Sequence, residues 1–364
     1  MKHIFKYTFL LFLLVGCKSL SVDSTSTFVK HSNKNIAYEG RLGVNETKTA
    51  SEIYWSGTSI KINFEGTTAK VILDDENGTN YFNVIIDGSK FETLKLNKGK
   101  NTYVLAKDLS KGKHSVELTK RNEWTFGKTQ LFGFEIEGKL LKPDAKKQLF
   151  FEFYGDSITA GHGNEDYSGN DKPEGNVTNN YNTYAAKTAR AFNAEYSCIA
   201  RGGIGIMVSW FNMIMPEMYD RLNPNDENSK WGFSKKTPDV VVVNLFQNDS
   251  WIVNRPKHEE FKRRFGTDKP SEEKIIESYA NFIKTIRGKY PKTPIVCLLG
   301  NMDITKDGSK WPGYVTKAVK SLNETKVYTC FAPYKGSKGH PKVKEHQLIA
   351  DKLIKKIESL NFNK

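Results

Sequence analysis

The stretch "FFEFYGDSITAGHG", residues 150–163, decides the fold of this chain. Its opening apolar run is short and rich in phenylalanine, as in a strand buried on both faces of a parallel sheet. The triplet Gly155-Asp156-Ser157 follows, where such a strand must turn into its next element. Ser157 is therefore predicted at the carboxyl edge of a sheet and at the start of a helix, where backbone N–H groups stabilise negative charge. This is the position of a nucleophile.

Strand and helix signals alternate from residue 148 onward. Strands are predicted at 149–154, 196–200, 239–245, 294–299 and 326–331, and helices at 181–194, 208–221, 271–289, 312–323 and 341–358. This alternation is typical of a parallel sheet with helices on both faces. Residues 28–140 instead alternate apolar and polar positions between glycine turns, without a long amphipathic helix. They predict an all-β sandwich or jelly roll.

The first residues form a unit of a different kind. Two lysines precede an apolar run that is too short to span a bilayer as a mature helix, which indicates a removed signal. The run ends in "LVGC", similar to the lipobox of bacterial lipoproteins. We therefore predict a lipoprotein signal peptide at 1–16, a lipidated Cys17 on a tether over 17–27, and export to a membrane-anchored place at the cell surface or in the periplasm. An ordinary secretory signal, with Cys17 incidental, is the alternative.

The composition limits the partners. The chain has 55 Lys and Arg and 41 Asp and Glu, and residues 1–16 hold two lysines and no acid, so the mature formal charge would be +12. This surplus suits an acidic polysaccharide or a membrane surface, whereas export argues against nucleic acid. A dispersed solvated coat of lysines is the alternative. The remaining cysteines, Cys198, Cys297 and Cys330, fit neither zinc nor disulfide spacing and are predicted to be core thiols.

Hydrolysis of an ester by a serine needs a base for its proton and donors for the oxyanion of the tetrahedral intermediate. The predicted base is His340, in the loop before Pro341, which suits the first turn of a helix. His346 falls inside that helix and is predicted to pack or cap instead.

The block "GDSIT", residues 155–159, resembles the first block of the SGNH, or GDSL, hydrolases, whose catalytic Ser, Gly, Asn and His lie in four separate blocks. The resemblance implies Ser157 and His340 as catalytic residues, and an oxyanion hole formed by Ser157, a glycine of "ARGGIGI" and Asn248. Because the register of the glycine block is open, Gly205 is the first choice and Gly203 the second.

Two departures from the family pattern stand out. Phe246 and Gln247 occupy the positions of the usual Gly-Thr before Asn-Asp, which affects the shape of the pocket. The acid that usually lies two or three residues before the histidine is absent, since Ser337 and Lys338 stand there. Another acceptor, such as a backbone carbonyl, can hold the ring N–H, so a Ser–His dyad is predicted.

The whole chain resembles carbohydrate esterase family two, through "YWSGTSIKINFEGT" in the β region, the junction into "FFEFYGDSITAGHG" and the late "GHPKVKEHQLIA". That family joins an N-terminal jelly roll, here 28–140, to an SGNH hydrolase domain with a flavodoxin-like sheet, here 148–364. The resemblance implies a serine esterase that removes O-acetyl groups from a polysaccharide or oligosaccharide, with no metal and no cofactor. Asp156, Trp210 and Trp251 are predicted to contact substrate, with core packing as the alternative for the tryptophans.

Two other functions stay open: an SGNH esterase for an anionic acetylated glycan, motivated by the positive charge, and a catalytically decayed glycan-binding surface lipoprotein, motivated by the altered Asn block and the missing acid. An α/β-hydrolase is disfavoured because the sequence has no Gly-x-Ser-x-Gly elbow. The oligomeric state is not predicted.

Overall fold

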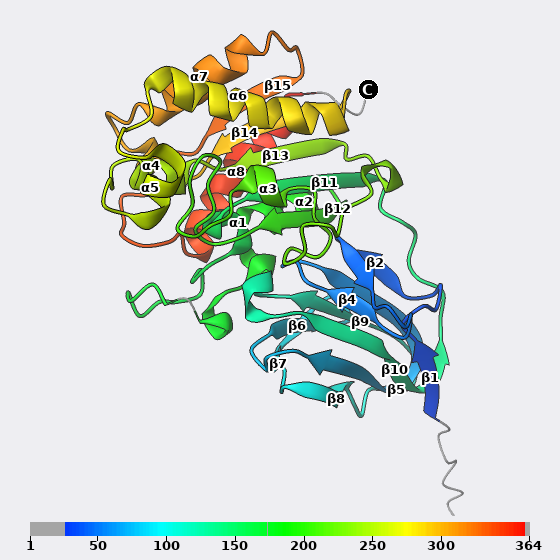
Figure 1. Cartoon of the computed structure of the whole chain (residues 1–364). Coiled ribbons are helices and arrows are strands. Elements are labelled where there is room, and N and C mark those ends of the chain that lie inside the picture. Colours follow the sequence, from blue (N-terminus) through cyan, green and yellow to red (C-terminus); the bar gives the residue numbers. More distant parts are fainter. Residues whose placement is uncertain (1–25, 173, 361–364) are drawn as a thin grey trace, which may run out of the picture.

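The computed structural model describes residues 26–172 and 174–360, which form an all-β part followed by an α/β part (Figure 1). The predicted signal peptide, Cys17 and the predicted tether up to residue 25 lie outside these residues, whereas the last two residues of that tether, Ser26 and Thr27, belong to the first strand. Within the described ranges, none of the helices combines the length and the apolar character needed to cross a membrane.

The first part is antiparallel, as predicted for a β sandwich. Its strands are β1 (Ser26–Lys30), β2 (Ala37–Glu39), β3 (Leu42–Val44), β4 (Ser51–Ile53), β5 (Ser59–Asp75), β6 (Tyr81–Ile86), β7 (Lys90–Lys95), β8 (Gly99–Ala106), β9 (Lys113–Lys120) and β10 (Thr129–Leu140). The first half of β5 pairs with β9 and the second half with β8, so this long strand connects the part of the sheet that contains β9 with the part that contains β8. The predicted hairpin signal Asp87-Gly88 is confirmed, because both residues have positive φ between β6 and β7.

The second part is a parallel five-stranded sheet with the order β12-β11-β13-β14-β15. Its strands are β11 (Leu149–Gly155), β12 (Ala194–Ala200), β13 (Val240–Asn244), β14 (Ile295–Leu299) and β15 (Val327–Phe331). This is the flavodoxin-like order, and each strand lies within two residues of its prediction. Buried β-branched and aromatic side chains on both faces explain why these runs lack strict alternation.

Helices cover both faces of the parallel sheet (Figure 1). They are α1 (Ser157–Ala160), α2 (Tyr184–Ala191), α3 (Met215–Met218), α4 (Gln247–Ile252), α5 (Glu259–Phe265), α6 (Glu272–Lys289), α7 (Trp311–Ser321) and α8 (Val343–Glu358). Helices α2 and α8 pack on one face, and α6 and α7 on the other. The three cysteines of the described part are buried and free, as predicted.

The helix predicted at 208–221 is wrong for most of its length, because only α3 forms there. The buried carboxylate of Asp249 accepts the N–H groups of Ile206, Met207 and Val208 at 2.7–3.1 Å and holds them in a loop. The apolar residues of this stretch pack into the core without helical order. Helices α4 and α5 were not predicted.

A fully buried ion pair joins the two parts. Arg41 of the β part donates to Glu152 on β11 at 3.2 Å and to the Tyr154 hydroxyl at 3.0 Å. Its second terminal nitrogen, Nη1, donates to the carbonyls of Tyr219 and Arg221. Since the guanidinium has these partners in the α/β part, the β part is anchored to the sheet that carries the site.

Candidate active site

The predicted catalytic residues gather at the carboxyl edge of the parallel sheet. Strand β11 lies between β12 and β13, so the turn after β11 is at the topological switch point of the sheet. Ser157 is the first residue of α1, and the Asp156 side chain caps this helix by accepting the Ile158 N–H at 3.0 Å. The Ser157 N–H has no partner inside such a helix and points out of its first turn.

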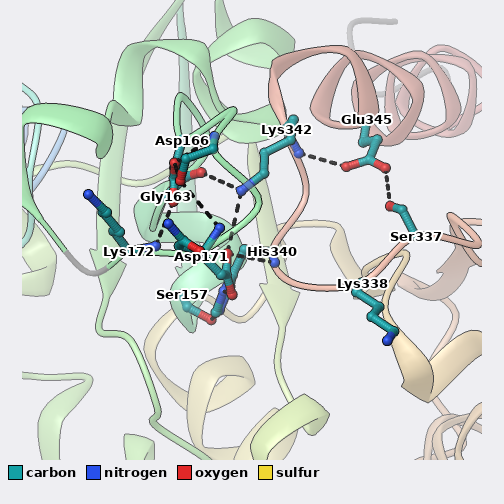
Figure 2. A network of polar contacts seen from close by, with 12 residues as sticks. Ser157, Gly163, Asp166, Asp171, Lys172, Ser337, Lys338, His340, Lys342 and Glu345 are labelled. Atoms are coloured by element: carbon teal, nitrogen blue, oxygen red, sulfur yellow. Dashed lines mark hydrogen bonds and ion pairs between the residues drawn. The ribbon is translucent and has the colours of Figure 1, made fainter.

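Ser157, His340 and Asp171 form a chain of hydrogen bonds (Figure 2). The Ser157 Oγ lies 2.9 Å from His340 Nε2, and the His340 Nδ1 lies 2.7 Å from Asp171 Oδ2. The Asp171 carboxylate also accepts the backbone N–H of His340 at 3.0 Å. With Nδ1 protonated, Nε2 is free to accept the serine proton, which is the arrangement a general base needs.

The prediction of a dyad without an acid is therefore wrong in its geometry. Asp171 comes from the polar loop after α1, 169 positions before the histidine, and its backbone has a left-handed φ of 53°. Burial opposes its charge, but the hydrogen bonds and positive charges of His340 and Lys342 outweigh burial and lower the pKa of Asp171 well below its usual range. The carboxylate is therefore ionised at neutral pH.

The loop that carries Asp171 is held by polar contacts from both of its sides (Figure 2). Asp166 accepts the Lys172 N–H at 2.7 Å, which closes the loop beside Asp171. The Lys342 ammonium donates to the Gly163 carbonyl at 2.8 Å and lies 3.4 Å from Asp171 Oδ1. These contacts hold the Asp171 carboxylate in place, although residues 161–172 form neither a helix nor a strand.

A second histidine packs on the first. The rings of His162 and His340 have centroids 4.4 Å apart. Burial, with the nearby positive charges of His340 and Lys342, lowers the pKa of His162 to about 4. His162 is therefore neutral at neutral pH and does not repel the positive charge that His340 gains when it takes a proton. His346 is buried, and its Nδ1 accepts the Tyr184 N–H at 3.2 Å, so its predicted packing role is confirmed.

Gly205 does not fit its predicted place in the oxyanion hole. It is buried, its N–H donates to Ser209 Oγ at 2.9 Å, and a Cβ there would overlap the Val208 carbonyl. Gly203 has a left-handed φ of 82° and packs beside Trp210. Gly202 faces the nucleophile instead.

A Cβ atom added at Gly202 would lie 3.7 Å from Ser157 Cβ. Its N–H donates to Glu123 Oε2, at 2.5 Å. Glu123 belongs to the β part, between β9 and the 3₁₀ turn η1 (Trp124–Phe126). The Gly block therefore reaches the site at its first glycine, together with a carboxylate that the sequence analysis did not single out.

Asn248 lies at the site as predicted, on the first turn of α4. Its Nδ2 donates to the Ile204 carbonyl at 2.9 Å and lies 3.5 Å from Asp156 Oδ2. Its Oδ1 accepts the Trp210 Nε1–H at 3.0 Å, which fixes the orientation of the amide. Trp210 therefore positions Asn248 rather than lying free at the mouth of the site. Asp156 is fully buried, which does not fit its predicted contact with substrate.

Trp251 lies one turn after Asn248 and is partly exposed. Its Nε1 donates to Asp303 Oδ2 at 3.2 Å, and it lines a surface cavity of about 480 Å³ together with Trp311 and Tyr314. Aromatic faces at an open cavity suit the stacking of a sugar ring. Within the described part of the chain, no cluster of three or more His, Cys, Asp or Glu side chains could hold a metal ion.

The protein resembles known esterases over nearly its whole length. A family two carbohydrate esterase from Clostridium thermocellum, solved with cellohexaose, is 32% identical, with a TM-score of 0.80 over 90% of this chain and 99% of that one. The chain belongs to carbohydrate esterase family two. The family described as "Carbohydrate esterase 2 N-terminal" matches residues 38–143 of this esterase.

Two curated relatives agree with this assignment. The "Cellulase/esterase CelE" of Acetivibrio thermocellus is 33% identical over 339 residues, which cover 90% of this esterase and 40% of that larger protein. An "Acetylxylan esterase / glucomannan deacetylase" of Cellvibrio japonicus is 23% identical and matches over 96% of both chains. The fold prediction and the assignment to carbohydrate esterases are confirmed.

The altered Asn block of this esterase has a structural explanation. Phe246 stands where the family pattern has glycine, and its backbone is left-handed, with φ 85° and ψ −12°. A non-glycine residue there costs about 1–2 kcal/mol. The Phe246 ring packs on Tyr279 and Trp311 with centroids 4.7 and 5.0 Å away, and this burial offsets the strain. The backbone turn before Asn248 is thus kept despite the change of residue.

Asp171, Gly202 and Glu123 are the site residues that the sequence analysis missed. Gly202 lay inside the predicted block, one residue before the second choice, so a count from the end of β12 would have found it. Asp171 and Glu123 carry no local signal, because each reaches the site only through tertiary contacts.

Proposed function

We propose that this esterase removes O-acetyl groups from a polysaccharide or oligosaccharide through Ser157, His340 and Asp171. The observation that carries the proposal is the hydrogen-bonded chain of these three residues at the switch point of the sheet. The names of the Cellvibrio relatives, acetylxylan esterase and glucomannan deacetylase, support acetylated plant polysaccharides as substrates.

In the proposed reaction, Ser157 Oγ attacks the acetyl carbonyl while His340 Nε2 takes its proton. Donors beside the nucleophile, the N–H groups of Ser157 and Gly202 and the Asn248 amide, stabilise the oxyanion. Collapse of the intermediate forms acetyl-Ser157, and His340 returns the proton to the sugar oxygen. Water, activated by His340, then releases acetate. Asp171 holds the ring and stabilises its positive charge in each step.

The test is release of acetate from 4-nitrophenyl acetate and from acetylated xylan, glucomannan and pectin by the wild type, Ser157→Ala and His340→Ala. Both substitutions are expected to abolish activity. Wild-type protein that releases no acetate from any substrate, but binds glycans equally well with Ser157→Ala, would instead establish the decayed binding protein. The intact hydrogen-bonded chain argues against that function.

An anionic acetylated glycan is the second candidate substrate. Lys269, Lys306 and Lys310 line the cavity beside Trp251 together with Asp303 and Asp307, so the charged lining has a small positive surplus that favours a negatively charged chain weakly. Activity on acetylated pectin above that on neutral xylan, lost at high salt, would support this candidate.

We also propose export as a lipoprotein anchored through Cys17. The sequence pattern at residues 1–17 supports it. Incorporation of a clickable palmitate analogue by wild-type cells, lost in Cys17→Ser, is the expected result; equal labelling of both proteins would contradict it.

A further inference from the structure

Glu123 brings a carboxylate from the β part to the oxyanion side of the active site. Its Oε2 accepts the Gly202 N–H at 2.5 Å, and Oε1 accepts the Thr125 hydroxyl at 2.8 Å. A Cβ added at Gly202 would lie 3.5 Å from Glu123 Oε1 and 3.7 Å from Ser157 Cβ. The carboxylate and the nucleophile therefore border the same small space.

The backbone that presents Glu123 is held firmly. The fully buried Lys120 ammonium donates to the carbonyls of Asn122 and Glu123 at 2.9 and 3.2 Å, and to Asn80 Oδ1 at 2.7 Å. The next side chain, Trp124, is buried in the core of the α/β part. The Glu123 backbone therefore stays in place while its side chain, which is only partly buried, can rotate.

An acetyl ester cannot react while Glu123 keeps this position. The Gly202 N–H must be released by the carboxylate to bind the developing oxyanion, because two negative oxygens that share one donor repel each other. Arg201 is one positive charge that interacts with Glu123. It stacks on Phe211 and Trp124 with its Cζ 3.1 and 4.9 Å from the ring centroids, and the charge of Glu123 acts on it.

We propose that Glu123 is a specificity residue of this esterase: substrate displaces its carboxylate from Gly202, and a hydroxyl of the alcohol part of the ester then donates to it. This rests on the proposed serine mechanism. An acetylated sugar supplies such a hydroxyl beside the ester, whereas a simple alkyl acetate leaves the displaced carboxylate without a partner. Glu123 thereby favours acetates of neutral polyhydroxylated alcohols over other acetates.

The test uses two esters with the same kind of primary leaving group, methyl 6-O-acetyl-glucopyranoside and cyclohexylmethyl acetate. For Glu123→Gln we expect kcat/KM to fall about tenfold for the sugar ester and to rise about threefold for the alkyl ester, because a charge-assisted hydrogen bond is lost and the oxyanion donor is freed. Thr125→Ala, which releases one carboxylate oxygen, should shift the ratio in the same direction by a smaller factor. Glu46→Gln, an exposed isosteric change in the β part, should leave both values unchanged.

Equal changes for the two esters, or no change, would overturn the proposal, because a structural role at the junction of the two parts would affect both alike. If Glu123→Gln does not fold, as judged by its melting temperature, the Thr125→Ala ratio decides, and an unchanged ratio overturns the proposal. The Ser157→Ala variant distinguishes failure of the proposed role of Glu123 from failure of the proposed serine mechanism. If it is inactive while the ratio never shifts, only the role of Glu123 fails; if it keeps wild-type rates, the serine mechanism fails and takes this inference with it.

Discussion

The carboxyl edge of the parallel sheet and the segments that close over it supply different parts of the site. At the edge, parallel strands end in register, so Ser157, Gly202 and Asn248 come together through sheet geometry. The closing segments, residues 161–172 with 174–178 and residues 120–124, are held largely by side-chain contacts. In the proposed mechanism the edge provides the nucleophile and the neutral donors, whereas the closing segments bring the two carboxylates, one against His340 and one against Gly202. The sheet edge therefore positions the groups that would react with the ester, and the closing segments place the two negative charges around them.

The largest expected effect comes from removing the Asp171 carboxylate, which the closing loop brings to His340. Asp171→Asn should lower kcat roughly 10³-fold, because an amide favours the wrong tautomer of His340 and cannot stabilise its positive charge. Steady-state kinetics with 4-nitrophenyl acetate measure the change. Asp108→Asn is the matched control, since Asp108 is an exposed aspartate with a similar left-handed backbone. Activity of Asp171→Asn within a factor of three of the wild type would show that Ser157 and His340 act as a dyad that does not need Asp171.

The second prediction concerns the anchor between the two parts. Arg41→Ala should lower the free energy of unfolding by about 3–5 kcal/mol, because it leaves the buried Glu152 charge without its partner. Urea denaturation measures the loss. Lys274→Ala, which breaks an exposed pair with Glu277, should cost less than about 1 kcal/mol. Equal losses in the two variants would mean that the buried pair does not anchor the β part.

The third prediction tests the edge itself. Asn248→Ala should lower kcat about 10²- to 10³-fold by removing one oxyanion donor, with little change in melting temperature beyond that of a small side-chain loss. Trp210→Phe, which keeps an aromatic ring but removes the indole N–H that orients the Asn248 amide, should give a decrease of a few fold. If Trp210→Phe loses as much activity as Asn248→Ala, the tryptophan does more than orient the amide.

The smallest effect is a pH dependence away from the site. Burial lowers the pKa of His346 to about 3, against about 6.5 when unfolded, so below pH 6.5 the unfolded chain binds a proton that the folded chain does not. Stability from this residue is complete above pH 6.5 and falls toward pH 3. His346→Asn keeps an acceptor for the Tyr184 N–H but does not titrate. Between pH 7.5 and 5.0 the wild type should lose about 2 kcal/mol relative to this variant in urea unfolding; parallel pH curves would contradict the assignment.

The helices and strands around the site differ in how far local sequence predicts them. The strands of the parallel sheet are runs of buried apolar residues, and their predicted bounds hold within two residues. The segment at 208–221 has the apolar spacing of a helix, but its apolar residues pack into the core from a loop whose start is held by the Asp249 carboxylate. A distant side chain therefore overrode local propensity.

The sequence by itself determined the two-part architecture and the candidates for nucleophile and base, because these depend on periodicity and on motifs of a few neighbouring residues. Ser157 follows from where a strand ends and a helix begins, whereas Asn248 and His340 were predicted with the help of the resemblance to the SGNH hydrolases. Tertiary structure alone decided which acid meets the histidine, which glycine faces the serine, and that the β part sends Glu123 into the site. Those pairings join residues 45–169 positions apart, and no local pattern encodes a contact formed only when two separately built surfaces pack together.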